Sequence, residues 1–269
     1  MDRRINLKKK LAALIFIVLV SFGIILGIYH ERKQNSQISV LQKKLEILTG
    51  DATLSDADKF RLSVSDKGGY NYLAIGNSIT VHPITDFWWG EWGMAATKAS
   101  SDYYHLVLED LQKKYNNVNS VAWNYSVWEN QAHDRTETYI QLDEFLDADI
   151  NLITIQLSEN VSDLTSFGID FESLLGHIQD ICPNARIIVI DDFWNGEKSE
   201  IKRNVCEKKG ICFIDLSDLR GKEEYMVGIG TAVEGNDGIE HIVEHSGVAV
   251  HPNDNAMLTI AERIIDEVE

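Results

Sequence analysis

The hydrophobic pattern changes character near residue 70, and the part before that point begins with a long apolar run. Residues 11–29 carry no charged side chain, and they are flanked by lysines on one side and by the charged stretch 30–33 on the other. At a helical rise of about 1.5 Å per residue, such a run spans the hydrocarbon core of a bilayer. We therefore predict a transmembrane anchor at 11–29. The alternative is a cleaved signal peptide, but its apolar stretch should be shorter and end in small residues.

The charges around this run predict its orientation. Residues 1–10 hold more basic side chains than the segment just beyond the run, and the more basic flank of a membrane span stays in the cytoplasm. We expect residues 1–10 to be cytoplasmic and the body of the protein to lie outside the cell membrane. The protein would then be a single-pass membrane protein.

The segment 30–69 is predicted to separate the anchor from a folded domain. Apolar residues recur at three- and four-residue spacing within 34–48, which indicates a short amphipathic helix or stalk. Residues 49–69 are rich in Gly, Asp and Ser, and we interpret them as linker.

From residue 70 onward, short apolar runs alternate with longer amphipathic ones. Alternation of strand and helix is typical of a parallel sheet covered on both faces, because parallel strands need crossover connections. We therefore predict one α/β domain at 70–269, and its ligands should bind beyond the carboxyl ends of the strands. The expected strands are 70–75, 120–124, 151–157, 186–190 and 211–216, and the expected helices are 95–115, 136–146, 171–181, 198–208 and 253–268.

Charge is distributed unevenly and excludes one class of partner. The formal net charge is −17, but residues 1–50 are basic, with nine Lys and Arg against three Asp and Glu. The remainder holds 16 Lys and Arg against 39 Asp and Glu. Nucleic-acid binding rests on basic side chains that neutralise phosphates. The acidic body therefore argues against a nucleic-acid partner.

A serine follows the first expected strand directly. Gly76 allows a tight bend, and Ser78 two residues later would be presented at the carboxyl end of the strand. Taken alone, the pattern is more typical of a serine that caps a helix or closes a turn.

A histidine stands just before the last expected helix. Pro252 restricts the backbone after His251, and Asn253 or Asp254 can cap the helix, so the imidazole would be held in place. A serine hydroxyl is a poor nucleophile unless a nearby base removes its proton. Ser78 and His251 are therefore candidates for a nucleophile and its base.

Four blocks of the sequence resemble, in order, the motifs of the SGNH hydrolases, also called GDSL-type esterases and lipases. Residues 76–78 read Gly-Asn-Ser where the family has Gly-Asp-Ser, and 124–129 match its Asn-containing second block. Residues 158–161 correspond to the third block, and His251 to the histidine of the last. The resemblance covers about residues 70–268.

The resemblance implies a fold and a reaction. The fold would be a flavodoxin-like three-layer α/β/α sandwich, and the reaction hydrolysis of a carboxylic ester through an acyl-serine, without a cofactor. Ser78 would be the nucleophile and His251 the base. The oxyanion would be stabilised by the backbone N–H groups of Ser78 and Glu129 and by the side-chain amide of Asn160.

Two positions depart from the family pattern. Glu129 stands where the second block has glycine, and Val248 stands where an aspartate normally precedes the histidine by three residues. That aspartate orients the imidazole and stabilises its charged form. A backbone carbonyl or another acid could hold the ring instead, and a non-catalytic glycan-binding module is the alternative. The candidate acids are Glu129, Glu159, Asp191, Asp192 and Glu244.

Tryptophans cluster near these blocks and suggest the substrate. Indole rings stack on sugars, so an aromatic rim outside the cell favours removal of small acyl groups, above all acetyl, from carbohydrate. Transfer of the acyl group to a sugar by the same residues is the alternative reaction. Trp123, inside a strand, is expected to be core. The possible substrate-binding residues are Trp88, Trp89, Trp92, Trp128 and Trp194.

The remaining histidines and cysteines do not indicate a metal site. His241 and His245 are four residues apart, but the surrounding stretch 235–247 reads as loop, so we interpret both as solvent-exposed. Cys206 and Cys212 flank a short turn and could be oxidised in an exported protein, or could be small apolar fillers.

Overall fold

The computed structural model describes residues 27, 55–64, 69–131 and 134–268. The predicted cytoplasmic segment 1–10, the stalk at 34–48 and, apart from Gly27, the anchor at 11–29 lie outside these residues. Across the described ranges, no helix combines the length and apolarity that a membrane crossing requires. By its contacts the chain divides into 1–54 and the unit Ser55–Glu269, and the unit Ser55–Glu269 contains the fold described below.

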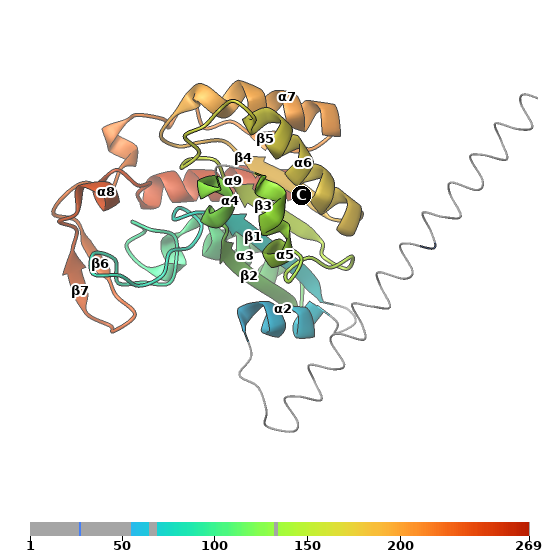
Figure 1. Ribbon diagram of the computed structural model, residues 1–269. Helices are drawn as coiled ribbons and strands as arrows, with labels where there is room; N and C mark the ends of the chain where they lie inside the picture. The colour runs from blue at the N-terminus through green and yellow to red at the C-terminus, as the bar shows by residue number, and fades with distance from the viewer. Residues whose placement is uncertain (1–26, 28–54, 65–68, 132–133, 269) are drawn as a thin grey trace, which may run out of the picture. The chain divides into compact units, whose positions relative to one another are not determined.

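A parallel sheet of five strands forms the centre of this unit (Figure 1). Its order is β2-β1-β3-β4-β5, and every neighbouring pair is parallel. Each strand lies where the hydrophobic pattern predicts one, although β3 and β5 are shorter than predicted. The bounds are β1 Tyr70–Gly76, β2 Val118–Asn124, β3 Leu152–Gln156, β4 Arg186–Ile190 and β5 Cys212–Ile214.

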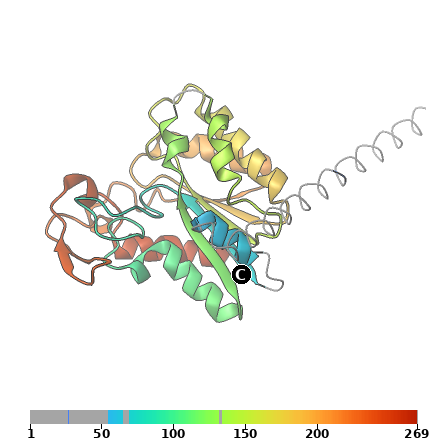
Figure 2. The same cartoon turned by 60° about the horizontal axis from the view of Figure 1, so that its bottom comes forward.

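Helices cover both faces of the sheet (Figure 2). Successive side chains of a strand point to opposite faces, so Tyr72 and Ala74 of β1 pack in one apolar cluster and Leu73 and Ile75 in the other. The first cluster includes side chains of α3 and α9, and the second includes side chains of α6 and α7. The predicted layered α/β arrangement is confirmed. The bounds are α3 Tyr103–Lys114, α9 Asp254–Val268, α6 Phe167–Ile181 and α7 Ser199–Lys209.

Two expected helices are shorter than the pattern indicates. α3 begins at Tyr103 rather than at 95, because the Asp102 side chain caps it by accepting from the His105 N–H. The stretch 136–146 contains only short pieces, η2 and α5. The short helices are η1 Ala99–Ser101, α4 Ser126–Asn130, η2 Arg135–Thr138, α5 Tyr139–Leu142, η3 Gly196–Lys198, η4 Glu223–Tyr225 and α8 Ser246–Ala249.

The assignment of 49–69 to linker is wrong for part of that segment. Residues Asp56–Val64 form helix α2, which buries Ala57, Phe60 and Val64 against the second apolar cluster. Ser55 and Asp58 exchange side-chain-to-backbone hydrogen bonds, a reciprocal cap that starts the helix. The helix therefore belongs to the folded unit.

The stretch 235–247, predicted to be loop, contains one strand of a hairpin and the start of α8. Strands β6 Ala232–Glu234 and β7 Glu240–Ile242 pair antiparallel. The hairpin lies beside the loop that follows β1 (Figure 1), since the Glu234 N–H donates to Thr97 O and the Asn236 N–H to Trp89 O. Two segments distant in sequence thus meet next to the carboxyl ends of the strands.

Candidate active site

Ser78 lies in a tight turn at the carboxyl end of β1. Gly76 is required there, because a Cβ atom would fall 1.8 Å from Thr80 Oγ1. The Asn77 side-chain oxygen accepts from the Ile79 N–H at 3.0 Å, which closes the turn. The Ser78 side chain is left partly exposed.

His251 comes from the segment between α8 and α9 and meets Ser78 directly. Its Nε2 lies 2.9 Å from Ser78 Oγ, and its Nδ1 lies 2.7 Å from the carbonyl oxygen of Gly247. A carbonyl can only accept, so Nδ1 carries the proton and the Nε2 lone pair faces the serine hydroxyl. The ring therefore has the tautomer that a general base for Ser78 needs.

A backbone carbonyl occupies the place of the usual aspartate. Val248 is 1% exposed and packs in the first apolar cluster. Each of the four buried or partly buried acids that the sequence offered as substitutes bonds to other groups, and Glu244 is exposed. Of the two alternatives that the sequence leaves open, an acid or a backbone carbonyl, the structure has the carbonyl of Gly247.

Burial controls the protonation of His251. The ring is 6% exposed, and burial lowers its pKa to about 4, with a further lowering from His82 and His245 and an opposing effect of the Gly247 carbonyl. At neutral pH the imidazole is therefore uncharged and able to accept a proton.

Trp194 packs against this histidine. The two rings meet edge to face with centroids 4.7 Å apart, and the indole N–H donates to Val250 O at 2.8 Å. The tryptophan is partly buried. Trp194 thus holds the backbone next to His251, and part of its side chain remains exposed beside the histidine.

Glu129 is buried between the motif loops. Its side chain is 2% exposed, and its carboxylate accepts from Asn77 Nδ2 at 3.0 Å and from the Ser158 N–H at 2.6 Å. The other carboxylate oxygen accepts from Asn160 Nδ2 at 2.7 Å. One carboxylate therefore joins the nucleophile turn to the loop that follows β3.

The three N–H groups expected at the oxyanion differ in their availability. No described residue accepts from the Ser78 N–H. Glu129 is the fourth residue of α4, and the carbonyl oxygen of the cap residue Tyr125 accepts from the Trp128 N–H at 3.0 Å. Asn160 is exposed, and its amide has a second hydrogen besides the one directed at Glu129.

The loop after β3 is strained at Ser158. Its φ of 110° lies in the region that favours glycine, and a non-glycine residue there costs about 1–3 kcal/mol. Two hydrogen bonds to carboxylates offset this cost, one from its N–H to Glu129 and one from its Oγ to Asp192 at 2.5 Å. The strain lies two residues before Asn160.

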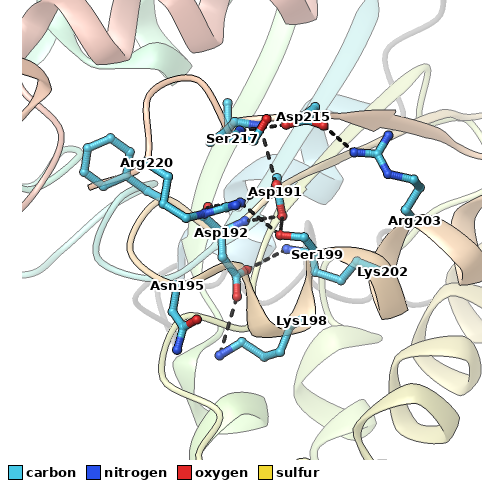
Figure 3. Close-up of polar contacts among 12 residues, drawn as sticks. Asp191, Asp192, Asn195, Lys198, Ser199, Lys202, Arg203, Asp215, Ser217 and Arg220 are labelled. Atoms are coloured by element: carbon cyan, nitrogen blue, oxygen red, sulfur yellow. Dashed lines mark hydrogen bonds and ion pairs between the residues drawn. The ribbon is translucent and has the colours of Figure 1, made fainter. Parts of the chain in front are cut away.

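A buried network fastens this loop to the end of β4 (Figure 3). Lys202 of α7 is fully buried, and its ammonium donates to Leu157 O, Ile190 O and Asp192 Oδ1 at 2.8–2.9 Å. Lys198 lies 3.5 Å from the other oxygen of Asp192. These contacts secure both loops at the carboxyl edge of the sheet.

A second part of the network surrounds Asp191. Its carboxylate accepts from Arg220, from Ser199 Oγ at 2.6 Å and from the Asp192 N–H at 2.8 Å (Figure 3). Sequence reasoning missed Lys202, Ser199 and Arg220, because a polar position in an amphipathic pattern does not show which way it faces.

Glu159 also links the loop after β3 to the loop after β4. Its carboxyl group accepts from the backbone N–H groups of Phe193 and Trp194. Burial, together with the neighbouring charge of Asp192, raises the pKa of Glu159 to about 8. Glu159 thus positions the residue that packs on His251.

The tryptophans divide into core and site residues. The expectation of substrate contact is corrected for Trp88, Trp92 and Trp128, which are buried in the apolar clusters. Trp89 is partly exposed and stacks on His241 at 4.5 Å. Trp89 and Trp194 therefore remain available to a ligand.

The other histidines and the cysteines have local contacts. His241 bonds to Asp237, and the described residues contain no cluster of side chains suited to a metal ion. The partly exposed Cys212 and the buried Cys206 are free thiols.

Comparison with known proteins gives structural but not sequence similarity. Neither a protein-family profile nor a curated protein sequence matches the chain. Among solved structures it is similar to a family two carbohydrate esterase from Clostridium thermocellum, solved in complex with cellohexaose. The identity is 15%, the TM-score 0.48, and the match covers 75% of this chain and 64% of the other. The chain thus spans less than two thirds of that protein's length.

Two further similar structures are closer to this chain in size. An acetyl xylan esterase from Geobacillus stearothermophilus is 15% identical with a TM-score of 0.46, and the match covers 75% of this chain and 95% of the other. An esterase from Pseudoalteromonas sp. is 12% identical with a TM-score of 0.46, covering 74% and 96%. Similarity at this level concerns the fold alone.

Proposed function

We propose that this chain is a serine esterase of the SGNH hydrolase type, with Ser78 as the nucleophile and His251 as its base. The observation that carries the proposal is the 2.9 Å contact between Ser78 Oγ and His251 Nε2, with Nδ1 bonded to Gly247 O. A nucleophile, a base and a group that orients the base are the parts that acyl transfer through serine requires.

The reaction follows from this geometry. Ser78 Oγ attacks the ester carbonyl carbon while its proton passes to His251 Nε2, and the carbonyl oxygen becomes an oxyanion. The Ser78 N–H and the second hydrogen of the Asn160 amide would stabilise that charge, with the Glu129 N–H as the third donor expected from the family. The imidazolium then gives its proton to the leaving alcohol, and water releases the acyl group by the same route.

The carbonyl partner affects the energetics of the base. Gly247 O fixes the ring but carries no full charge, so it stabilises the imidazolium less than a carboxylate would. A weakly basic imidazole removes the serine proton less readily, but its conjugate acid protonates the leaving oxygen more readily. The arrangement therefore favours esters whose leaving oxygen needs protonation, as the hydroxyl of a sugar does.

The substrate class is part of the proposal. We infer that the protein removes small acyl groups, above all acetyl, from carbohydrate. Trp194 beside His251 and Trp89 near the hairpin offer aromatic surface of the kind that packs on sugar rings. The expected place of action is outside the cell, with residues 11–29 as the membrane anchor.

Labelling with a fluorophosphonate tests the catalytic centre. The full chain should be labelled covalently and should release acetate from acetylated xylan or mannan, and Ser78→Ala should abolish both. Lack of labelling and of acetate release from folded protein would contradict the proposal. An added sugar acceptor distinguishes hydrolysis from transfer, because transfer yields a new acetylated sugar in place of acetate.

One observation favours a second candidate function. No carboxylate contacts His251 among the described residues, because its Nδ1 faces the carbonyl oxygen of Gly247. This feature would weaken catalysis but not binding, as expected for a non-catalytic glycan-binding module. The doubly substituted Ser78→Ala, His251→Ala protein would then bind glycan as well as the unsubstituted chain, which would itself release no acetate.

Membrane attachment needs a separate test. Full-length protein expressed in a bacterial host should stay in the membrane pellet after alkaline carbonate, and protease added to intact spheroplasts should digest the body. Recovery in the soluble fraction would contradict an uncleaved anchor.

A further inference from the structure

Glu129 has a set of partners that only a carboxylate can satisfy. Its oxygens accept from Asn77 Nδ2, from the backbone N–H of Ser158 and from Asn160 Nδ2. The Asn160 N–H is a further, longer contact at 3.5 Å. All of these groups are N–H donors, and a side chain that is 2% exposed has little solvent to replace them.

The positions of these partners connect the two sides of the site. Asn77 immediately precedes Ser78 in the nucleophile turn, and its own oxygen closes that turn. Asn160 lies in the loop after β3, two residues beyond the strained Ser158. A single carboxylate therefore connects the nucleophile turn to the amide that is expected to stabilise the oxyanion.

We propose that Glu129 is a positioning residue for ester hydrolysis, which holds the Asn160 amide with its nitrogen toward the reaction site and fixes it relative to Ser78. The inference rests on the proposed function and deepens it. An asparagine amide can turn by about 180° and exchange its oxygen and nitrogen. An acceptor at 2.7 Å from Nδ2 selects one of these two orientations.

The same contact explains why a glutamate at this position is compatible with an oxyanion. A free carboxylate near the developing negative charge would oppose it. Here the carboxylate accepts hydrogen bonds from several N–H groups of two loops, which compensate its charge. The carboxylate polarises the amide and orders it before the substrate arrives, which lowers the reorganisation that accompanies the reaction.

Glu129→Gln tests the proposal with little change in volume. Its Oε1 can keep the Asn77 and Ser158 contacts, but its Nε2 would face Asn160 Nδ2, and the amide would turn. We expect kcat for 4-nitrophenyl acetate to fall about tenfold or more, with KM changed by less than about threefold. Glu109→Gln, an exposed position on α3 paired with Lys113, is the matched control and should leave kcat unchanged.

A double-mutant cycle distinguishes positioning from general support of the fold. If Glu129 acts through Asn160, Glu129→Gln should reduce kcat only slightly when Asn160 is already alanine. The proposal would be overturned if Glu129→Gln reduced kcat as much in the Asn160→Ala chain as it does in the chain that retains Asn160. It would also be overturned if Glu129→Gln lowered the melting temperature enough to unfold the variant at the assay temperature. Glu129→Asp, which keeps the charge but is one methylene shorter, should retain more activity than Glu129→Gln.

A spectroscopic readout separates failure of this inference from failure of the proposed function. The side-chain amide resonances of Asn160, assigned by their loss in Asn160→Ala, should shift in Glu129→Gln and not in Glu109→Gln. This measurement does not need turnover. If the chain shows the shift but is inactive and is not labelled, both the proposed esterase activity and the role of Glu129 in ester hydrolysis are refuted. An active chain without the shift refutes the role of Glu129 alone.

Discussion

At the scale of single residues, the chemistry depends on how His251 is held. The ring is buried, its Nδ1 faces a carbonyl, and the aspartate position is occupied by the core residue Val248. Among the residues that the structure describes, a charged imidazole therefore has no anionic partner at this site. Its protonation should be governed by burial rather than by an ion pair.

This leads to a prediction about pH. Because burial lowers the pKa of His251 to about 4, the base stays deprotonated down to mildly acidic pH. The acid limb of kcat/KM, which reports the free enzyme, should lie near pH 4, with the rate falling as the pH drops through that value. An acid limb at pH 6.5 or above, in a profile measured with 4-nitrophenyl acetate, would contradict the structure.

Restoring the family's aspartate should not restore a triad. Val248 is packed among apolar side chains, so Val248→Asp would bury a carboxylate while Gly247 O still occupies Nδ1. We expect the free energy of unfolding to fall by about 2–4 kcal/mol, with no gain in kcat. Urea unfolding of Val248→Asp beside the exposed control Ile229→Asp measures this. A more active and equally stable variant would be the contrary result.

At the scale of elements, α7 secures the edge of the sheet at which the site lies. Lys202 reaches from the helix to the carbonyl groups at the ends of β3 and β4. It also donates to Asp192 (Figure 3). Asp192 in turn accepts from Ser158. The helix is thus connected through buried charges to the loop that carries Asn160.

Removal of this lysine should therefore affect both stability and the site. Lys202→Met leaves the more distant Lys198, at 3.5 Å, as the remaining cation beside the buried Asp192 among the described residues. The loss of one partner of a buried pair costs about 3–5 kcal/mol. Lys208→Met on the same helix removes an exposed pair with Glu172 and should cost less than about 1 kcal/mol. Equal effects of the two substitutions on unfolding by urea would argue against a supporting role of the network.

At the scale of the whole molecule, the boundary of the folded unit lies before α2. The helix contributes Phe60 and Val64 to the second apolar cluster, and the Asn119 side chain of the edge strand β2 donates to Ser63 O. The folded unit therefore includes residues that composition alone assigns to a linker.

Truncation tests this boundary. A chain that begins at residue 55 should unfold at the same denaturant concentration as the full protein. A chain that begins at residue 70 should lose about 2–4 kcal/mol, because the partners of Phe60 and Val64 become exposed. If both truncated chains unfold alike, α2 is not part of the cooperative unit.

Much of the fold could be predicted from the local pattern of apolar residues. Where that prediction was wrong, there is a physical cause. The five strands are continuous apolar runs because both faces of a parallel sheet are buried, and such runs are visible in a sequence. The spacing of Ala57, Phe60 and Val64 is helical, but the surrounding Gly, Asp and Ser obscured it. The hairpin β6–β7 is too short and too exposed to leave a clear alternation.

The sequence by itself determined which residues could do chemistry: a serine after a strand, a histidine before a helix, and an asparagine in an intervening loop. It also showed that Val248 cannot hold an imidazole. Only the tertiary structure decided that Gly247 O holds the ring, that Glu129 joins two loops, and that three tryptophans are core. The reason is that a backbone carbonyl is the same in every residue, and the direction of a side chain is set by packing between segments far apart in sequence.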